Sequence, residues 1–164
     1  MPLLWVPLSR RGGAENLPWT PLYIELEADP LTDIPHLPGT VVGLRIPLGP
    51  QVVETVLEAV RREVAVVHLC ADAVGRDTSG RPIPDALQEI HQALVRAALR
   101  DRVTLVVSGG IAAAEHVVKS IACGADLVAI DDILLVAWGC ALWADRGRCP
   151  VETEEIPPEW ARSA

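Results

Sequence analysis

The chain has 164 residues, half of them hydrophobic, and its 14 Lys and Arg against 22 Asp and Glu give a net charge of −8. This length suits one domain or two small ones and is enough to bury a hydrophobic core. The acidic balance argues against a nucleic-acid-binding protein, which would need clustered basic residues. The longest nearly pure hydrophobic run, residues 133–143, is shorter than the roughly 20 residues that span a bilayer, so we expect no membrane segment.

The four cysteines are Cys70, Cys123, Cys140 and Cys149, and no two of them form a Cys-x-x-Cys pair. This spacing predicts neither a zinc site nor a disulfide framework. The first residues carry no cationic region before their apolar stretch, so we read no secretory signal. Together these features favour a reducing cytoplasm as the location.

The chain divides into three parts by composition. Residues 1–22 hold four prolines and no clear hydrophobic period, which predicts an irregular N-terminal arm. Residues 23–144 alternate short apolar runs with amphipathic stretches and form the predicted folded domain. Residues 145–164 form a charged C-terminal tail.

Within the domain, strand and helix patterns alternate, and a loop rich in Gly, Asp, Ser, Thr and Pro covers residues 71–84. The predicted strands are residues 23–28, 41–46, 65–69, 103–107 and 127–130. The predicted helices are residues 51–63, 85–99, 112–122 and 133–144.

Several of these strands are apolar on both faces, which is typical of a parallel sheet covered by helices in an α/β protein. A complete (β/α)8 barrel needs about 250 residues, so the pattern predicts a partial, half barrel of about four to five parallel strands. A five-stranded doubly wound sheet also fits the length.

Functional residues of both architectures gather at the carboxyl ends of the strands. There, Ser108, Gly109, Gly110 and Ile111 lie between a strand and a helix start. Two glycines let backbone N–H groups face outward and approach an anion closely, and the helix dipole adds positive charge, so the motif suits a phosphate. A tight strand-to-helix turn without a ligand would have the same sequence.

Arg45 ends a predicted strand and would be partly buried, so it requires either an anionic ligand or a carboxylate such as Glu27 or Asp72. His68 lies within a strand, between Val67 and Leu69, and is interpreted as a core histidine with satisfied hydrogen bonds.

Asp131 and Asp132 follow the last predicted strand. Two acids in this place could cap the next helix. They would also repel a phosphate that bridged the last two turns, since like charges disfavour each other.

A longer run of residues resembles the FMN-binding barrel domain of the glutamate synthase family. The resemblance is carried by residues 86–95, 99–105 and 108–111, and it continues in order through residues 124–126, 135–140 and 149–151. In all it covers residues 41–160, which correspond to the carboxyl-terminal half of that barrel.

The resemblance implies a (β/α)8 flavoprotein that aminates 2-oxoglutarate and binds FMN. Ser108, Gly109 and Gly110, with Ile111 beside them, fall on the family's phosphate turn. Arg45 falls where the family usually has a lysine near the flavin ring.

Departures from the family pattern point to a shortened, degenerate relative. The loop over residues 71–77 has lost most of the family's glycines, and Asp131-Asp132 replaces a glycine-containing turn. Cys140 and Cys149 are remnants of a three-cysteine iron–sulfur segment, and two thiolates alone cannot hold the cluster. The amino-terminal half of the barrel is missing from the resemblance.

Three functions remain open at this stage, and no catalytic residue is assigned. The first is an FMN-binding half-barrel, an oxidoreductase of glutamate metabolism if active, which completes itself as a homodimer or with a complementary barrel half. The second is a catalytically inactive interaction or regulatory module. The third is an α/β domain that binds a phosphorylated metabolite.

Overall fold

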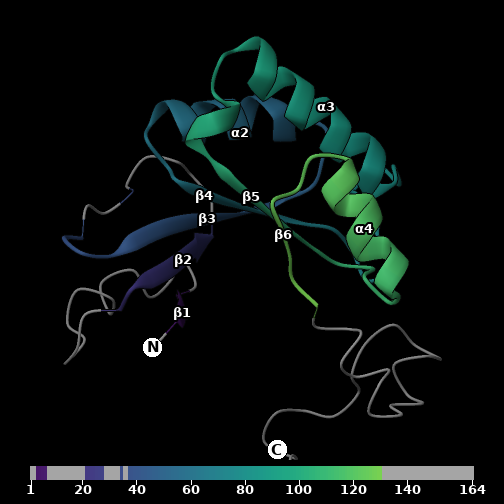
Figure 1. The fold of residues 1–164 in the computed structure, drawn as a ribbon, viewed down its shortest axis with the longest axis horizontal. Coiled ribbons are helices and arrows are strands. Elements are labelled where there is room, and N and C mark those ends of the chain that lie inside the picture. The colour runs from purple at the N-terminus through teal and green to yellow at the C-terminus, as the bar shows by residue number, and fades with distance from the viewer. Residues whose placement is uncertain (1–2, 7–20, 28–33, 35–36, 131–164) are drawn as a thin grey trace, which may run out of the picture.

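The computed structural model describes residues 3–6, 21–27, 34 and 37–130, which form a parallel sheet with helices packed on one face (Figure 1). The strands are β1 (Leu3–Val6), β2 (Tyr23–Glu27), β3 (Val41–Pro47), β4 (Val66–Cys70), β5 (Thr104–Ser108) and β6 (Leu127–Val128). The helices are α2 (Val52–Arg61), α3 (Ile83–Arg96) and α4 (Ala114–Ala122), and a 3-10 turn, η2 (Arg100–Arg102), precedes β5.

The strand order decides between the two predicted architectures. All pairs are parallel, and the order in the sheet is β1-β2-β3-β4-β5-β6, so each strand lies beside its neighbour in sequence. A doubly wound sheet would reverse this order at a switch point. The doubly wound alternative is therefore wrong, and the partial barrel is confirmed; within the described residues the sheet is not closed.

One prediction about the strands needs correction. The sequence predicted four to five strands and an irregular arm over residues 1–22, yet Leu3–Val6 pairs in parallel with Tyr23–Leu26 and makes a sixth strand. Pro2 and Pro7 flank this short strand. Proline lacks the N–H that a β-ladder needs, so a proline-rich stretch suggests irregular chain. The four residues between these two prolines keep their N–H groups and can pair.

The core lies between the sheet and the helices. Because side chains alternate across a strand, every second residue of β2 to β5 points toward the helices, and all of these except Val42 are almost fully buried. Helices α2 and α3 meet this face with apolar side chains three and four residues apart. The sheet contributes Ile24, Leu26, Leu44, Ile46, Val67, Leu69, Leu105 and Val107, and the helices contribute Val52, Val56, Val60, Leu87, Ile90 and Leu94.

Two further predictions, the helix over residues 133–144 and the charged tail over 145–164, lie outside the described residues. Within the described part, no helix combines the length and the hydrophobicity needed to cross a membrane.

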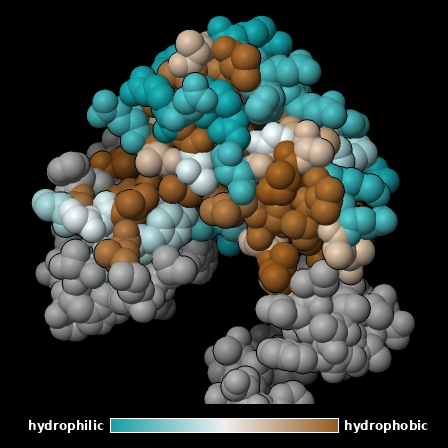
Figure 2. Space-filling model, in the orientation of Figure 1, coloured by the Kyte–Doolittle hydropathy of each residue, from teal (hydrophilic) through white to brown (hydrophobic). Residues whose placement is uncertain are grey.

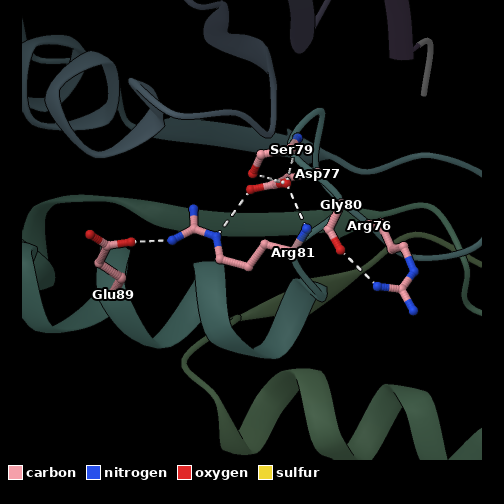
Figure 3. Close-up of polar contacts among 6 residues, drawn as sticks. All are labelled: Arg76, Asp77, Ser79, Gly80, Arg81 and Glu89. Atoms are coloured by element: carbon pink, nitrogen blue, oxygen red, sulfur yellow. Dashed lines mark hydrogen bonds and ion pairs between the residues drawn. The ribbon is translucent and has the colours of Figure 1, made fainter.

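A buried carboxylate organises the long loop between β4 and α3 (Figure 3). Asp77 Oδ1 accepts hydrogen bonds from the Ser79 N–H (2.8 Å), the Ser79 hydroxyl (2.6 Å) and the Arg81 N–H (2.9 Å). Its Oδ2 accepts one from Arg81 Nε at 3.0 Å, and Arg81 also pairs with Glu89 on α3. The Ser79 hydroxyl, together with these other donors, lowers the pKa of Asp77 to about 2. Arg81 thus connects the Asp77 carboxylate of the loop to Glu89 on α3.

We expect Asp77→Ala to lower the free energy of unfolding and to increase amide hydrogen exchange in residues 77–81, because several donors would lose one acceptor. Hydrogen exchange and urea unfolding at pH 7 measure both effects. Asp101→Ala, at an exposed site on η2, is the matched control and should change neither. Equal behaviour of the two variants would contradict this role for Asp77.

Candidate functional site

The face of the sheet opposite the helices carries a row of polar side chains. On β2 the buried Ile24 and Leu26 face the helices, so Tyr23 and Glu25 face the other way. The same alternation places Arg45 of β3, His68 of β4 and Ser108 of β5 on this polar face. Arg45 and His68 are partners in the β3–β4 register, so they lie side by side.

Two short hydrogen bonds link β2, β4 and β5 across this face. His68 Nδ1 lies 2.8 Å from Glu25 Oε1, and His68 Nε2 lies 2.8 Å from Ser108 Oγ. Tyr23 donates its hydroxyl to the other Glu25 oxygen at 3.1 Å, and Arg45 Nη1 lies 3.9 Å from Glu25 Oε1. We call Glu25, His68 and Ser108 the polar relay.

The electrostatics of the relay favour a charged histidine. Burial alone would lower the pKa of His68, but the neighbouring Cys70 and Glu25 side chains outweigh it and raise the pKa to about 9. Burial alone would raise the pKa of Glu25, but its bonds with His68 and Tyr23 and the charge of Arg45 outweigh burial and lower it. At neutral pH the relay therefore holds an imidazolium against a carboxylate.

This protonation state defines the chemistry that the relay can perform. A serine–histidine–carboxylate row is the order of atoms in a nucleophilic triad, where a neutral imidazole accepts the serine proton. A histidine that is already protonated cannot accept that proton, and Ser108 is only 5% exposed. The raised pKa of His68 and the burial of Ser108 therefore argue against a nucleophilic serine at neutral pH.

The turn that follows Ser108 is built on direct backbone contact. Gly109 and Gly110 have φ of +94° and +65°, a region that side chains with a Cβ disfavour. A Cβ on Gly109 would lie 2.5 Å from the Ala71 carbonyl oxygen, and one on Gly110 would lie 2.3 Å from the Gly75 nitrogen. The glycines thus let the turn pack on the backbone of the loop that Asp77 holds in place.

The turn also presents donors. The backbone N–H groups of Gly109, Gly110 and Ile111 have no hydrogen-bond acceptor among the residues that the structure describes. The Ala112 N–H, by contrast, lies 3.2 Å from His116 Nδ1. The Ile111 side chain is buried, 2% exposed, and anchors the turn beside α4. Three consecutive N–H groups at the carboxyl edge of a parallel sheet can bind an anion.

The predicted site residues are distributed as follows. Arg45 lies on the polar face, where Nη1 is 3.9 Å from Glu25 Oε1 and Glu27 is its register partner on β2. The interpretation of His68 as a buried, hydrogen-bonded histidine agrees with its two short contacts. Asp72 turns inward to its own loop, where its carboxylate accepts the N–H groups of Val74 and Arg76.

Other residues singled out in the sequence fall beyond the described part of the chain: Asp131, Asp132, Cys140 and Cys149. Among the described residues, no group of three or more His, Cys, Asp or Glu is arranged to hold a metal ion.

Sequence reasoning missed two members of the polar face, Tyr23 and Glu25. Site residues were expected at the carboxyl ends of strands, whereas Glu25 lies in the middle of β2. A signal was present, because Tyr23, Glu25 and Glu27 alternate with Ile24 and Leu26. The regular alternation of polar and apolar residues marks a strand whose second face is left uncovered by the helices that the structure describes.

We expect Gly110→Ala to destabilise the protein far more than Gly80→Ala. Both glycines have positive φ, but a Cβ on Gly80 meets nothing within 4 Å. Gly80→Ala should therefore cost about 1 kcal/mol of unfolding free energy from backbone strain alone. Gly110→Ala should cost about 1–3 kcal/mol more, because the loop must move away. Urea unfolding measures both, and equal costs would contradict the contact.

Comparisons with known proteins add to this geometry. A family profile described as a conserved region in glutamate synthase matches residues 70–153. The archaeal glutamate synthase (NADPH) of Methanocaldococcus jannaschii is 40% identical over 79 residues, which cover 48% of this chain and 15% of that protein. The archaeal-type enzyme of Thermotoga neapolitana is 36% identical over 99 residues, covering 54% of this chain and 20% of that one.

A solved structure of a flavocytochrome b2 double mutant with pyruvate bound has a TM-score of 0.51 and 26% identity. The match covers 62% of this chain and 25% of that one. The matched segments thus span a fifth or less of the two curated glutamate synthases. The family profile covers half of the chain, including β5, the glycine turn and α4, and on this ground the chain belongs to the glutamate synthase family.

Proposed function

We propose that this chain forms part of an FMN-binding barrel of the glutamate synthase type, in which the turn Gly109–Gly110–Ile111 binds the phosphate of FMN. The observation that carries the proposal is the set of three consecutive N–H groups without an acceptor among the described residues. They lie at the carboxyl edge of a parallel sheet, where ligands of barrel and open α/β proteins bind.

The residues around the turn fit an FMN phosphate. A phosphate requires hydrogen-bond donors and positive charge. The turn offers the donors, and the His68 ring, whose pKa is raised, contacts Ser108, the residue directly before the turn. The described side chains in contact with the turn include His116, whose Nδ1 lies 3.1 Å from the Gly110 carbonyl. The likeness to a flavocytochrome supports a flavin as the ligand.

Arg45 is the second predicted contact. Its side chain is 40% exposed on the polar face and stands two strands away from the phosphate turn. A guanidinium in this place would lie toward the flavin ring and favour negative charge on it. FMN would supply electron and hydride transfer when bound, and membership of the glutamate synthase family makes a glutamate-forming oxidoreductase the proposed reaction class.

The proposal predicts that FMN binds at least about tenfold more tightly than riboflavin, because only FMN carries the phosphate that the turn accepts. Flavin fluorescence quenching measures both dissociation constants. Arg45→Gln should weaken FMN and riboflavin alike, by about fivefold, and leave their ratio unchanged, because the proposed role of Arg45 concerns the ring and not the phosphate. Arg61→Gln, exposed on α2, is the control and should change neither. Equal affinity for FMN and riboflavin would overturn the proposal.

A second candidate, an interaction module, is favoured by an apolar patch at the β6 edge. Figure 2 shows hydrophobic atoms gathered over β6 and α4. The patch is made by Val118 and Ile121 of α4 with Leu127 and Ile130 at β6, each 44% exposed or more. β6 is an edge strand of the described sheet, where a further strand can pair. A second copy of this chain could bury the apolar patch in a symmetric pair.

If a second copy covers the patch, light scattering should give twice the chain mass at micromolar concentration, and Leu127→Asp should give the single-chain mass. Val95→Asp is the matched control, since Val95 is exposed on α3 outside the patch. A monomeric wild-type protein, or a dimer that survives Leu127→Asp, would contradict this candidate.

A further inference from the structure

We propose that Ser120 and Lys119 of α4 bind a phosphate group in a cavity beside the glycine turn (residues 109–111). The cavity has a volume of about 190 Å³ and lies between this turn, α4, the loop before α3 and the start of α3. Drug-sized ligands fill pockets of about 300 Å³ or more, so this space suits a phosphate group rather than a flavin ring. Where the phosphate is that of FMN, the inference rests on the proposed function. Free phosphate has the same chemistry, and the test separates the two sources.

The Ser120 hydroxyl is the observation that points to a ligand. Ser120 lines the cavity and is only 4% exposed, yet its hydroxyl has no hydrogen-bond partner in the part of the chain that the structure describes. Buried polar groups in native proteins almost always have a partner, and leaving one unpaired is costly. The hydroxyl is therefore a buried donor available to a ligand.

Donors from two elements meet in this cavity. His116, Lys119 and Ser120 are three and four residues apart, so they share one face of α4. That face lines the cavity together with Gly110 and Ile111, whose N–H groups have no acceptor among the described residues. The turn and the helix thus supply backbone N–H groups, a hydroxyl and an ammonium group around one space. Such a set suits the three oxygens of a phosphate better than the planar pair of a carboxylate.

His116 holds these two elements at a fixed spacing. Its Nδ1 lies 3.1 Å from the Gly110 carbonyl oxygen and 3.2 Å from the Ala112 nitrogen, so the first turn of α4 is tied to the glycine turn. Another wall of the cavity is apolar and is formed by Ile83 and Pro84 at the start of α3, the helix beside α4 (Figure 1). Apolar walls lower the local dielectric constant, which strengthens the attraction between an ammonium group and an anion.

One acidic group competes with the phosphate for Lys119. Glu115 Oε1 lies 3.1 Å from Lys119 Nζ, and the two side chains are 67% and 61% exposed. Exposed ion pairs of this kind are weak, and Glu115 is not among the residues that line the cavity. A phosphate in the cavity can therefore draw Lys119 away from Glu115 at little cost.

Chemical modification tests the occupancy of the cavity directly, because Lys119 is the only lysine in the chain. The full chain is treated with limiting acetic anhydride at about pH 8, where phosphate is doubly ionised, and acetylated peptides are quantified by mass spectrometry. Saturating inorganic phosphate or FMN should remove most of the reactivity of Lys119, whereas the N-terminal amino group, the internal reference, should keep its reactivity.

The pattern of protection identifies the source of the phosphate. Protection by FMN but not by riboflavin assigns the cavity to the FMN phosphate, and protection by inorganic phosphate alone assigns it to free phosphate. Equal protection by all three compounds, or by none of them, would overturn the inference.

Variants of the cavity separate binding from stability. Ser120→Ala should weaken binding of inorganic phosphate or FMN, whichever protects Lys119, about tenfold. Lys119→Met should weaken it about fivefold, and Glu115→Gln should strengthen it about twofold. Ser120→Ala should not lower the midpoint of urea unfolding, because its hydroxyl has no partner to lose. Thr55→Ala and Arg61→Met, both on α2, are the matched controls and should leave binding unchanged.

The same variants distinguish this inference from the proposed function. Suppose that the wild-type protein binds FMN about tenfold more tightly than riboflavin, but that Lys119 is not protected and Ser120→Ala and Lys119→Met keep the same ratio. This result would overturn the inference and leave the phosphate site at the turn intact. A wild-type ratio near one would instead remove the proposed function, while protection of Lys119 by inorganic phosphate would still support the cavity.

Discussion

The contact between the glycine turn and the loop before α3 is the constraint on which the rest of this site depends. Gly109 and Gly110 approach the backbone of residues 71–75 so closely that no side chain fits between them. This contact fixes the carboxyl end of β5 relative to that of β4, and the buried Asp77 holds the loop in the required shape. The direction of three backbone N–H groups is therefore determined by packing, before any ligand arrives.

The polar relay is the second element, and it connects this turn to the rest of the sheet. A buried histidine normally avoids charge, because burial penalises the ionised form. Here the neighbouring Cys70 and Glu25 side chains compensate for that cost, and the His68 ring contacts Ser108, the residue before the turn. Positive charge and free donors thus converge at one edge of the sheet, whereas the helix-covered face is entirely apolar.

The parts of the fold and the site that depend on neighbouring residues in the sequence were predicted, and those that depend on contacts between distant segments were not. The strands β2 to β5 and the helices α2 to α4 follow from hydrophobic periodicity, and their predicted bounds lie within a few residues of the observed ones. The strand β1 was missed because its pairing with β2 is a tertiary contact, and the prolines around it suggested irregular chain. The turn was found from Ser108-Gly109-Gly110, but its contact with Gly75 depends on the loop conformation. Glu25 was missed because its role exists only when β2, β4 and β5 share one face.

The most direct test of the account is to follow backbone amide signals by NMR while FMN is added to the protein. The amide protons of Gly109, Gly110 and Ile111 should shift downfield together and saturate at one FMN per chain. Binding of FMN that leaves these three amides unchanged would contradict the assignment of the turn as the phosphate site.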